Sequence, residues 1–181
     1  MNNTELIIEQ TKKWITDVVI ACNFCPFAAK EVKQNRVCYL VELSDDPGTC
    51  LQSVLQECRR LDDNAGIETT FLIMPNAVPS FEKYLDLLAA AEKLLEKKGY
   101  EGIYQVASFH PLYLFAGAPE TDAANYTNRS PYPMLHLLRE ESIEKVLEKY
   151  PDPDQIPERN IRFAREKGTA YLQMLLAACM K

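Results

Sequence analysis

The sequence lacks the features by which membrane and exported proteins are recognised. No run approaches the roughly 18 consecutive apolar residues of a membrane span, because the C-terminal run from Leu172 to Met180 is about half that length and contains Gln173. Glu5 and Glu9 precede any basic residue, so we expect neither a secretory signal nor a transit peptide. The sequence therefore predicts a cytoplasmic protein that does not enter a membrane.

Positive charge is also scarce. Lys and Arg number 20 against 26 Asp and Glu, which gives a net charge of −6 and an isoelectric point near 5.1. Such a chain repels the phosphates of nucleic acids, so we expect no nucleic-acid partner. The sequence contains no dinucleotide fingerprint, P-loop or EF-hand loop, and we expect no cofactor.

Metal-binding spacings are absent as well. The two histidines, His110 and His136, do not have the i, i+4 spacing of a zinc protease. Cys22 and Cys25 form one CxxC pair, which is half of a zinc site, and nothing in the sequence requires the histidines to complete it. We expect no metal. We also expect unpaired thiols, since no export signal indicates an oxidising compartment.

What is present is an alternation of strands and helices in 181 residues, which we interpret as a single globular domain, 1–181. This pattern predicts an α/β fold with a small three- to four-stranded sheet packed by helices and a helical C-terminal third. A ferredoxin-like α+β fold is the alternative, because three strands do not fix their order. Asn23 and Gly99 are predicted to end helices, since both residue types tolerate left-handed backbone. The predicted strands are 36–43, 67–74 and 103–109, with 112–115 as a short fourth; the predicted helices are 4–21, one from Pro26, 49–62, 79–98, and pieces from about 131.

A segment without helical or strand periodicity, 116–130, ends in Asn128, Arg129 and Ser130. Ser130 is predicted to cap a helix whose first turn contains Pro131. Free N–H groups at a helix start, together with a guanidinium, suit a phosphate or a carboxylate. An ordinary capped helix with a surface arginine is the alternative.

The two histidines flank this segment. His110 follows the predicted strand 103–109, and ligands of α/β sheets bind outside the carboxyl ends of strands. His136 lies about two turns into the predicted helix, where it is either a hydrogen-bonded core residue or a site residue. If the segment folds back, these histidines and Arg129 converge on one pocket.

Cys25 is the candidate nucleophile. At the N-cap of a helix starting at Pro26, its thiol pKa would be lowered by the helix dipole and nearby N–H groups. The alternatives are a redox or zinc pair with Cys22, and packing of both thiols in the core.

Several blocks of sequence together resemble an uncharacterised bacterial family of about this length and of unknown function. The resemblance covers nearly the whole chain, and it implies equivalents of Cys25, His110, Asn128, Arg129, Ser130, His136, Arg139 and Asn160. The family usually has an aliphatic residue at the position of Cys22, which argues against redox or zinc chemistry there. The resemblance favours functional roles for His110, Arg129 and His136, but it implies no activity. The matching blocks are Cys-Pro-Phe-Ala (25–28), Gln-Val-Ala-Ser-Phe-His-Pro (105–111), Phe-Ala-Gly (115–117), Thr-Asn-Arg-Ser-Pro-Tyr-Pro (127–133), Leu-His-Leu-Leu-Arg-Glu (135–140) and Glu-Arg-Asn-Ile (158–161).

These residues support three hypotheses. The first is a small enzyme, a hydrolase or group transferase, that acts on an anionic small molecule with Cys25 as nucleophile, His110 as acid or base, and His136 as a further catalytic residue. The second is a non-catalytic domain that binds an anion or a partner. The third is a structural polar network that pins the long segment, with Arg129 paired to a carboxylate. The candidate substrate-binding residues are Asn128, Arg129, Ser130, Tyr132 and Arg139.

Overall fold

The computed structural model describes residues 3–181 and contains one four-stranded sheet in the order β1-β2-β4-β3. The strands are β1 (Val37–Val41), β2 (Thr69–Ile73), β3 (Tyr104–Phe109) and β4 (Met134–Arg139). The α-helices are α1 (Asn3–Trp14), α2 (Ala28–Lys33), α3 (Pro47–Asp63), α4 (Phe81–Lys97), α5 (Glu140–Leu147), α6 (Ile156–Lys167) and α7 (Thr169–Cys179). A π-helix, η1 (Ile15–Ile20), and the 3₁₀ helices η2 (Ala123–Thr127) and η3 (Pro153–Gln155) complete the elements.

The sheet is mixed. β1 and β2, which α3 connects along the chain, pair in parallel. β4 runs antiparallel to both of its neighbours, β2 and β3. The predicted α/β class, a sheet of three to four strands and the helical C-terminal region are confirmed.

The fourth strand is not the one expected. Residues 112–115 form no strand, and the predicted helix from residue 131 is wrong over Met134–Arg139, which is β4. The physical reason is burial on both sides of the segment. Leu135 and Leu137 face one layer of helices and Met134 faces the other, while the backbone pairs with two strands at once. A helix would have placed Leu135 and Leu137 on opposite sides, because residues i and i+2 share a face only in a strand, and it would have left β2 and β3 unbridged.

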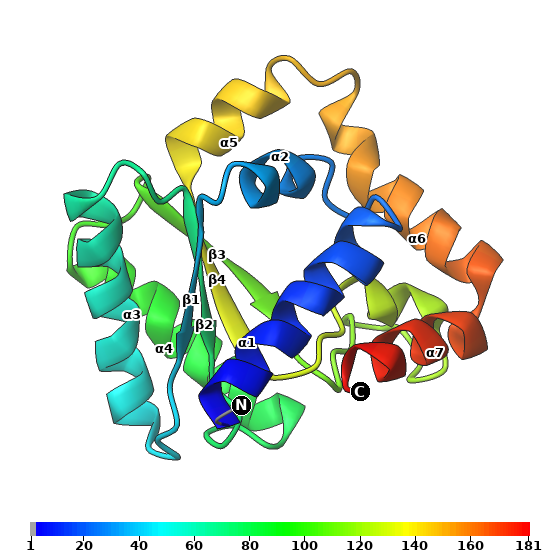
Figure 1. Ribbon diagram of the computed structural model, residues 1–181, viewed down its shortest axis with the longest axis horizontal. Coiled ribbons are helices and arrows are strands. Elements are labelled where there is room, and N and C mark those ends of the chain that lie inside the picture. Colours follow the sequence, from blue (N-terminus) through cyan, green and yellow to red (C-terminus); the bar gives the residue numbers. More distant parts are fainter. Residues whose placement is uncertain (1–2) are drawn as a thin grey trace.

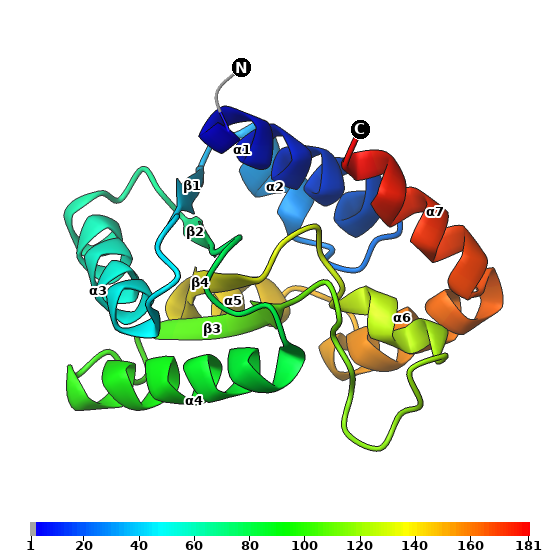
Figure 2. The same ribbon diagram turned by 90° about the horizontal axis from the view of Figure 1, so that it is seen from below.

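Each face of the sheet has its own hydrophobic core, and Figure 1 shows the two layers of helices that cover them. Leu72, Leu135 and Leu137 pack with the buried residues of α3 and α4. Phe71, Ile73 and their neighbours face α1 and η1, and α2 and α5 lie on that side too. Figure 2 shows α6 and α7 away from α3 and α4, next to η2 and α1.

The first predicted helix, 4–21, divides into α1 and η1. In η1 the hydrogen bonds span one residue more than in an α-helix, as in the 2.9 Å bond from Phe24 N to Val19 O. η1 ends at Ile20; Asn23 lies in the turn that follows with φ 54°, and Gly99 follows α4 with φ 78°, so both adopt the left-handed backbone that was predicted. The next helix starts at Ala28 rather than Pro26, so Phe27 and not Cys25 is its N-cap residue. None of the helices described is long and apolar enough to cross a membrane.

Candidate functional site: an apolar pocket with Cys25 and His136

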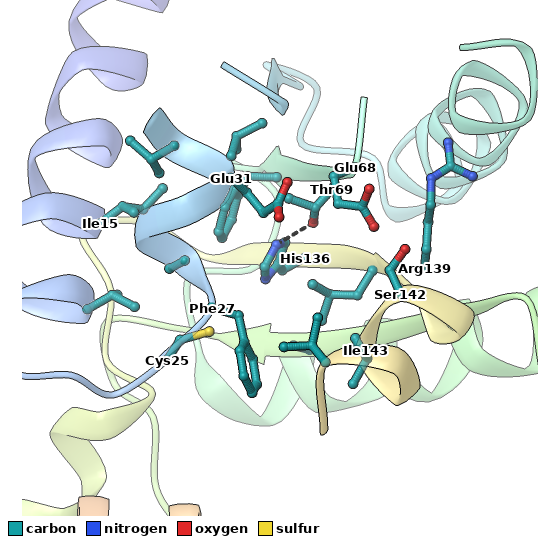
Figure 3. A pocket seen from close by; sticks show the side chains of 18 of the residues that line it. Ile15, Cys25, Phe27, Glu31, Glu68, Thr69, His136, Arg139, Ser142 and Ile143 are labelled. Atoms are coloured by element: carbon teal, nitrogen blue, oxygen red, sulfur yellow. Dashed lines mark hydrogen bonds between the residues drawn. The ribbon is translucent and has the colours of Figure 1, made fainter. Parts of the chain in front are cut away.

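A pocket of about 230 Å³ lies on the sheet face that carries α1, α2 and α5. Aromatic and aliphatic side chains form most of its wall, and a few polar side chains reach it (Figure 3). The strands provide the floor because every second side chain of β2, β3 and β4 points to this face. The main apolar lining residues are Trp14, Ile15, Phe27, Phe71, Phe109 and Ile143; the polar ones include Cys25, Glu31, Glu68, Thr69 and His136.

His136 lies in the inner strand β4, opposite Phe71 of β2 and Ala107 of β3. Its ring stacks on Phe71 with the ring centres 3.8 Å apart and the planes 9° from parallel. Burial lowers its pKa to about 3. The imidazole is therefore neutral at neutral pH.

The hydrogen bonds of Thr69 fix the form of that neutral ring. The Thr69 hydroxyl donates to the carbonyl oxygen of Leu137 at 2.6 Å, and its Oγ1 lies 2.5 Å from Nε2 of His136. A hydroxyl has one hydrogen to donate, so Nε2 carries the proton and donates to Oγ1. Nδ1 of His136 is then a hydrogen-bond acceptor at the pocket, and no described residue donates to it.

Cys25 reaches the pocket from the loop between η1 and α2 (Figure 3). Helix α6 holds this loop: the Asn160 amide donates to the carbonyl oxygen of Phe24 at 2.7 Å, and Arg159 donates to that of Asn23. Burial raises the pKa of the Cys25 thiol, and the N–H groups of Phe27 and Ala28 oppose this rise only in part. The thiol is thus protonated at neutral pH, contrary to the lowered pKa expected for a helix N-cap. Cys22, the other half of the CxxC pair, is buried in the hydrophobic core with Trp14.

An acidic group borders the same pocket and was missed by the sequence reasoning. Arg36 lies between the carboxylates of Glu31 and Glu68, with Nη1 3.4 Å from Oε2 of Glu31 and an ion pair to Oε2 of Glu68. Oε2 of Glu31 and Oε1 of Glu68 are buried and accept no hydrogen bond. The available signal was Glu68 itself, a charged residue directly before the buried strand β2.

His110 does not line this pocket. Its side chain is 1% exposed and packs against Phe81 and Tyr84 of α4. Nδ1 accepts from the N–H of Leu112 at 3.0 Å, and Nε2 donates to the carbonyl oxygen of Val78 at 3.1 Å. Both ring nitrogens are thus bound to backbone, and burial lowers the pKa of the ring.

Arg129 and its neighbours do not form the start of a helix. Their side chains instead hold the segment 116–130 in place through internal hydrogen bonds. The guanidinium donates to the carbonyl oxygens of Tyr113 at 3.2 Å and Glu120 at 3.4 Å, and it lies 4.5 Å from the centre of the Tyr126 ring. No helix begins at Ser130, because the chain continues into β4, and its hydroxyl donates to the carbonyl oxygen of Tyr132. The predicted anion site therefore lacks the helix N-terminus on which it partly rested.

Asn128 and Tyr132 also make internal bonds. The Asn128 amide donates to the carbonyl oxygen of Ser108 at 3.1 Å, and the Tyr132 hydroxyl donates to Oε1 of Gln10. Neither side chain lines the pocket. They connect the long segment to β3 and to α1.

Arg139 lines the pocket, but its guanidinium turns away from it (Figure 3). It donates to the carbonyl oxygens of Leu61, Asn64 and Ile67, at and beyond the C-terminal end of α3. These contacts connect β4 to the C-terminal end of α3, where a cation also suits the helix dipole.

The structure therefore brings together Cys25 and His136, with part of Arg139, and it places His110, Asn128, Arg129, Ser130 and Tyr132 outside the pocket. Among residues 3–181, no group of three or more His, Cys, Asp or Glu side chains is placed to hold a metal ion.

Comparison with known proteins gives a family but no activity. No curated protein and no solved structure is significantly similar to the chain. Residues 6–174 match the family described as "Protein of unknown function (DUF1415)". This match spans nearly all of the chain and agrees with the resemblance noted in its sequence blocks. The chain therefore belongs to the DUF1415 family.

Proposed function

We propose that the pocket binds a small, mostly apolar molecule and that Cys25 and His136 contact it. The observation that carries this proposal is the pocket of about 230 Å³ with predominantly apolar walls and a few polar groups. Such a composition is typical of small-molecule sites.

Binding is favoured over acid–base catalysis because both candidate reactive groups are uncharged at neutral pH. The pKa of His136 is about 3, and burial raises the pKa of the Cys25 thiol. A general base is most effective with a pKa near the working pH, and a cysteine attacks as thiolate. The molecule bound here would meet a thiol and a neutral imidazole.

The second candidate is the hydrolase or group transferase with Cys25 as nucleophile. The presence of Cys25 and His136 in one pocket supports it. In that reaction the sulfur would bond to the electrophilic atom of the substrate while its proton passes to Nδ1 of His136, and the bond to the leaving group would break as that group takes the proton. Water, or the acceptor in a group transfer, would then displace the sulfur and return a proton to it. His136 would then have the role that the sequence suggested for His110.

The experiment that tests the binding proposal fills the pocket. Ala107 lines it from β3, and Ala107→Leu adds apolar volume there; Ala89→Leu makes the same change on the exposed side of α4 as a control. A thermal-shift screen would use small apolar compounds with neutral, cationic or anionic groups. A compound at 100 times its dissociation constant adds about 2.7 kcal/mol of stability. We expect stabilisation of the wild type and of Ala89→Leu, but not of Ala107→Leu.

Two results would contradict the proposal. One is a screen in which no apolar compound stabilises the wild type. The other is a stabilising compound that acts equally on Ala107→Leu, because that compound would bind elsewhere on the protein.

A further inference from the structure

We infer that the molecule bound in this pocket carries an amine, which is held at the end formed by Glu31, Glu68 and His136. This inference rests on the proposed binding function and adds the chemical class of the ligand: a primary amine on an apolar aliphatic or aromatic body. Figure 3 shows the side chains of Glu31, Glu68 and Thr69 at one end of the pocket, near the ring of His136.

Apart from the Ser142 hydroxyl, which can donate as well as accept, the polar atoms available to a ligand at this end are acceptors. Oε2 of Glu31 and Oε1 of Glu68 are buried and receive no hydrogen bond. The proton of His136 is committed to Thr69 through Nε2, which leaves Nδ1 as an acceptor. The Thr69 hydrogen is committed to the carbonyl oxygen of Leu137. A ligand that matches this set must supply donors, and a protonated amine supplies three.

The charge at this end also favours a cation. Two carboxylates share Arg36, whose side chain is 31% exposed. Lys30 lies 3.5 Å from Oε1 of Glu31 but is 63% exposed, so solvent screens it. The guanidinium of Arg139 is occupied by backbone carbonyls at the end of α3. An anionic ligand would meet two carboxylates with no available cation, whereas an ammonium would complete their neutralisation.

The rest of the pocket sets the body of the ligand. Phe27 comes from the loop before α2, and Ile143 and Val146 come from α5. No residue of α5 is buried in the core, so its apolar side chains instead border the pocket. These walls would enclose a hydrocarbon chain or an aromatic ring next to the amine.

The test compares three probes with the same body and different polar groups: hexylamine, hexanol and hexanoate. We measure binding to the full chain by isothermal titration calorimetry. Hexylamine is expected to bind about tenfold more tightly than hexanol, because one hydrogen bond to a charged group contributes about that much affinity. Hexanoate is expected not to bind. Glu68→Gln and Glu31→Gln should each weaken hexylamine binding by about tenfold and leave hexanol binding unchanged. Glu141→Gln is the control, because Glu141 is 78% exposed on α5 and does not line the pocket.

The outcomes separate this inference from the proposed function. If hexanol or hexanoate binds the wild type as tightly as hexylamine, and Ala107→Leu still abolishes binding, the amine inference is overturned and the binding pocket stands. If none of the three binds, both are overturned. If a Gln variant fails to fold, the ranking of the three probes on the wild type still decides the question.

Discussion

The substitution Arg129→Lys distinguishes an anion-binding arginine from one that holds the chain in place. The Arg129 guanidinium makes hydrogen bonds of 3.2 and 3.4 Å to the carbonyl oxygens of Tyr113 and Glu120 and lies over the ring of Tyr126. A lysine can make one of the two hydrogen bonds at a time, since it lacks the planar fork of donors. The lost bond comes from a charged group, which contributes about 1.5–3 kcal/mol, and its partial exposure places it at the low end of that range. With part of a cation–π contact of about 0.5–1 kcal/mol, the expected loss of unfolding free energy is about 2 kcal/mol.

For a domain of this size, about 2 kcal/mol corresponds to a fall in Tm of about 4–8 °C. Differential scanning calorimetry of the wild type and Arg129→Lys, each with and without inorganic phosphate, measures this fall. Arg59→Lys is the matched control, because Arg59 is exposed on α3. We expect the same fall with and without phosphate. The reasoning is refuted if phosphate raises the Tm of the wild type but not that of Arg129→Lys, because Arg129 would then bind the anion as the sequence suggested.

Two further predictions concern the pocket itself. The pKa of His136 is about 3 in the folded protein against 6.5 for a free histidine, so the unfolded chain takes up the proton first. The stability due to the neutral ring is then complete above pH ~6.5 and falls by up to about 1.4 kcal/mol per pH unit toward pH ~3. Urea unfolding at a series of pH values should give a shallower dependence for His136→Phe than for the wild type, and equal slopes would rule out the buried neutral ring. At Cys25, whose thiol pKa is raised by burial, alkylation by iodoacetamide at neutral pH should be slower than that of a small free thiol and should speed up as the pH rises. Peptide mapping measures this rate. Unusually fast labelling of Cys25 would contradict the raised pKa and support the hypothesis that Cys25 is a thiolate nucleophile.

Most of the elements could be read from the sequence because their signals are local. The helices α3 and α4 show apolar residues at helical spacing, and β2 is a short apolar run that ends at a proline. β4 has no such signal. Its residues, Met-Leu-His-Leu-Leu-Arg, include good helix formers and no β-branched residue, and burial on both faces removes the alternation that marks a half-exposed strand. The pairing of β4 with β2 and β3 overrides these local preferences, and nothing in the segment itself reveals the two partners.

The site could be predicted only in part, because the sequence shows the chemistry of each residue but not which residues the fold brings together. The sequence predicts Cys25 and His136 as catalytic residues, but their meeting in one pocket depends on His136 lying in a strand that faces α2. Arg129 was selected for its chemistry, which also suits the backbone carbonyls that it binds. Glu31 and Glu68 gave little signal, because a glutamate is common on any helix or strand end. Their role depends on Arg36 and on the pocket, which only the fold brings together.

The position of β4 in the sheet also affects how the protein is synthesised. This inner strand is the last of the four to leave the ribosome, and β2 and β3 have no hydrogen bonds to each other without it. A nascent chain that ends before Met134 exposes one edge of β2 and both edges of β3, and open strand edges promote pairing between chains. The sheet therefore cannot be completed until Met134–Arg139 has left the ribosome. Substitutions that delay the docking of Met134–Arg139 should lower the yield of folded protein through aggregation during synthesis, even where the finished fold is fully stable.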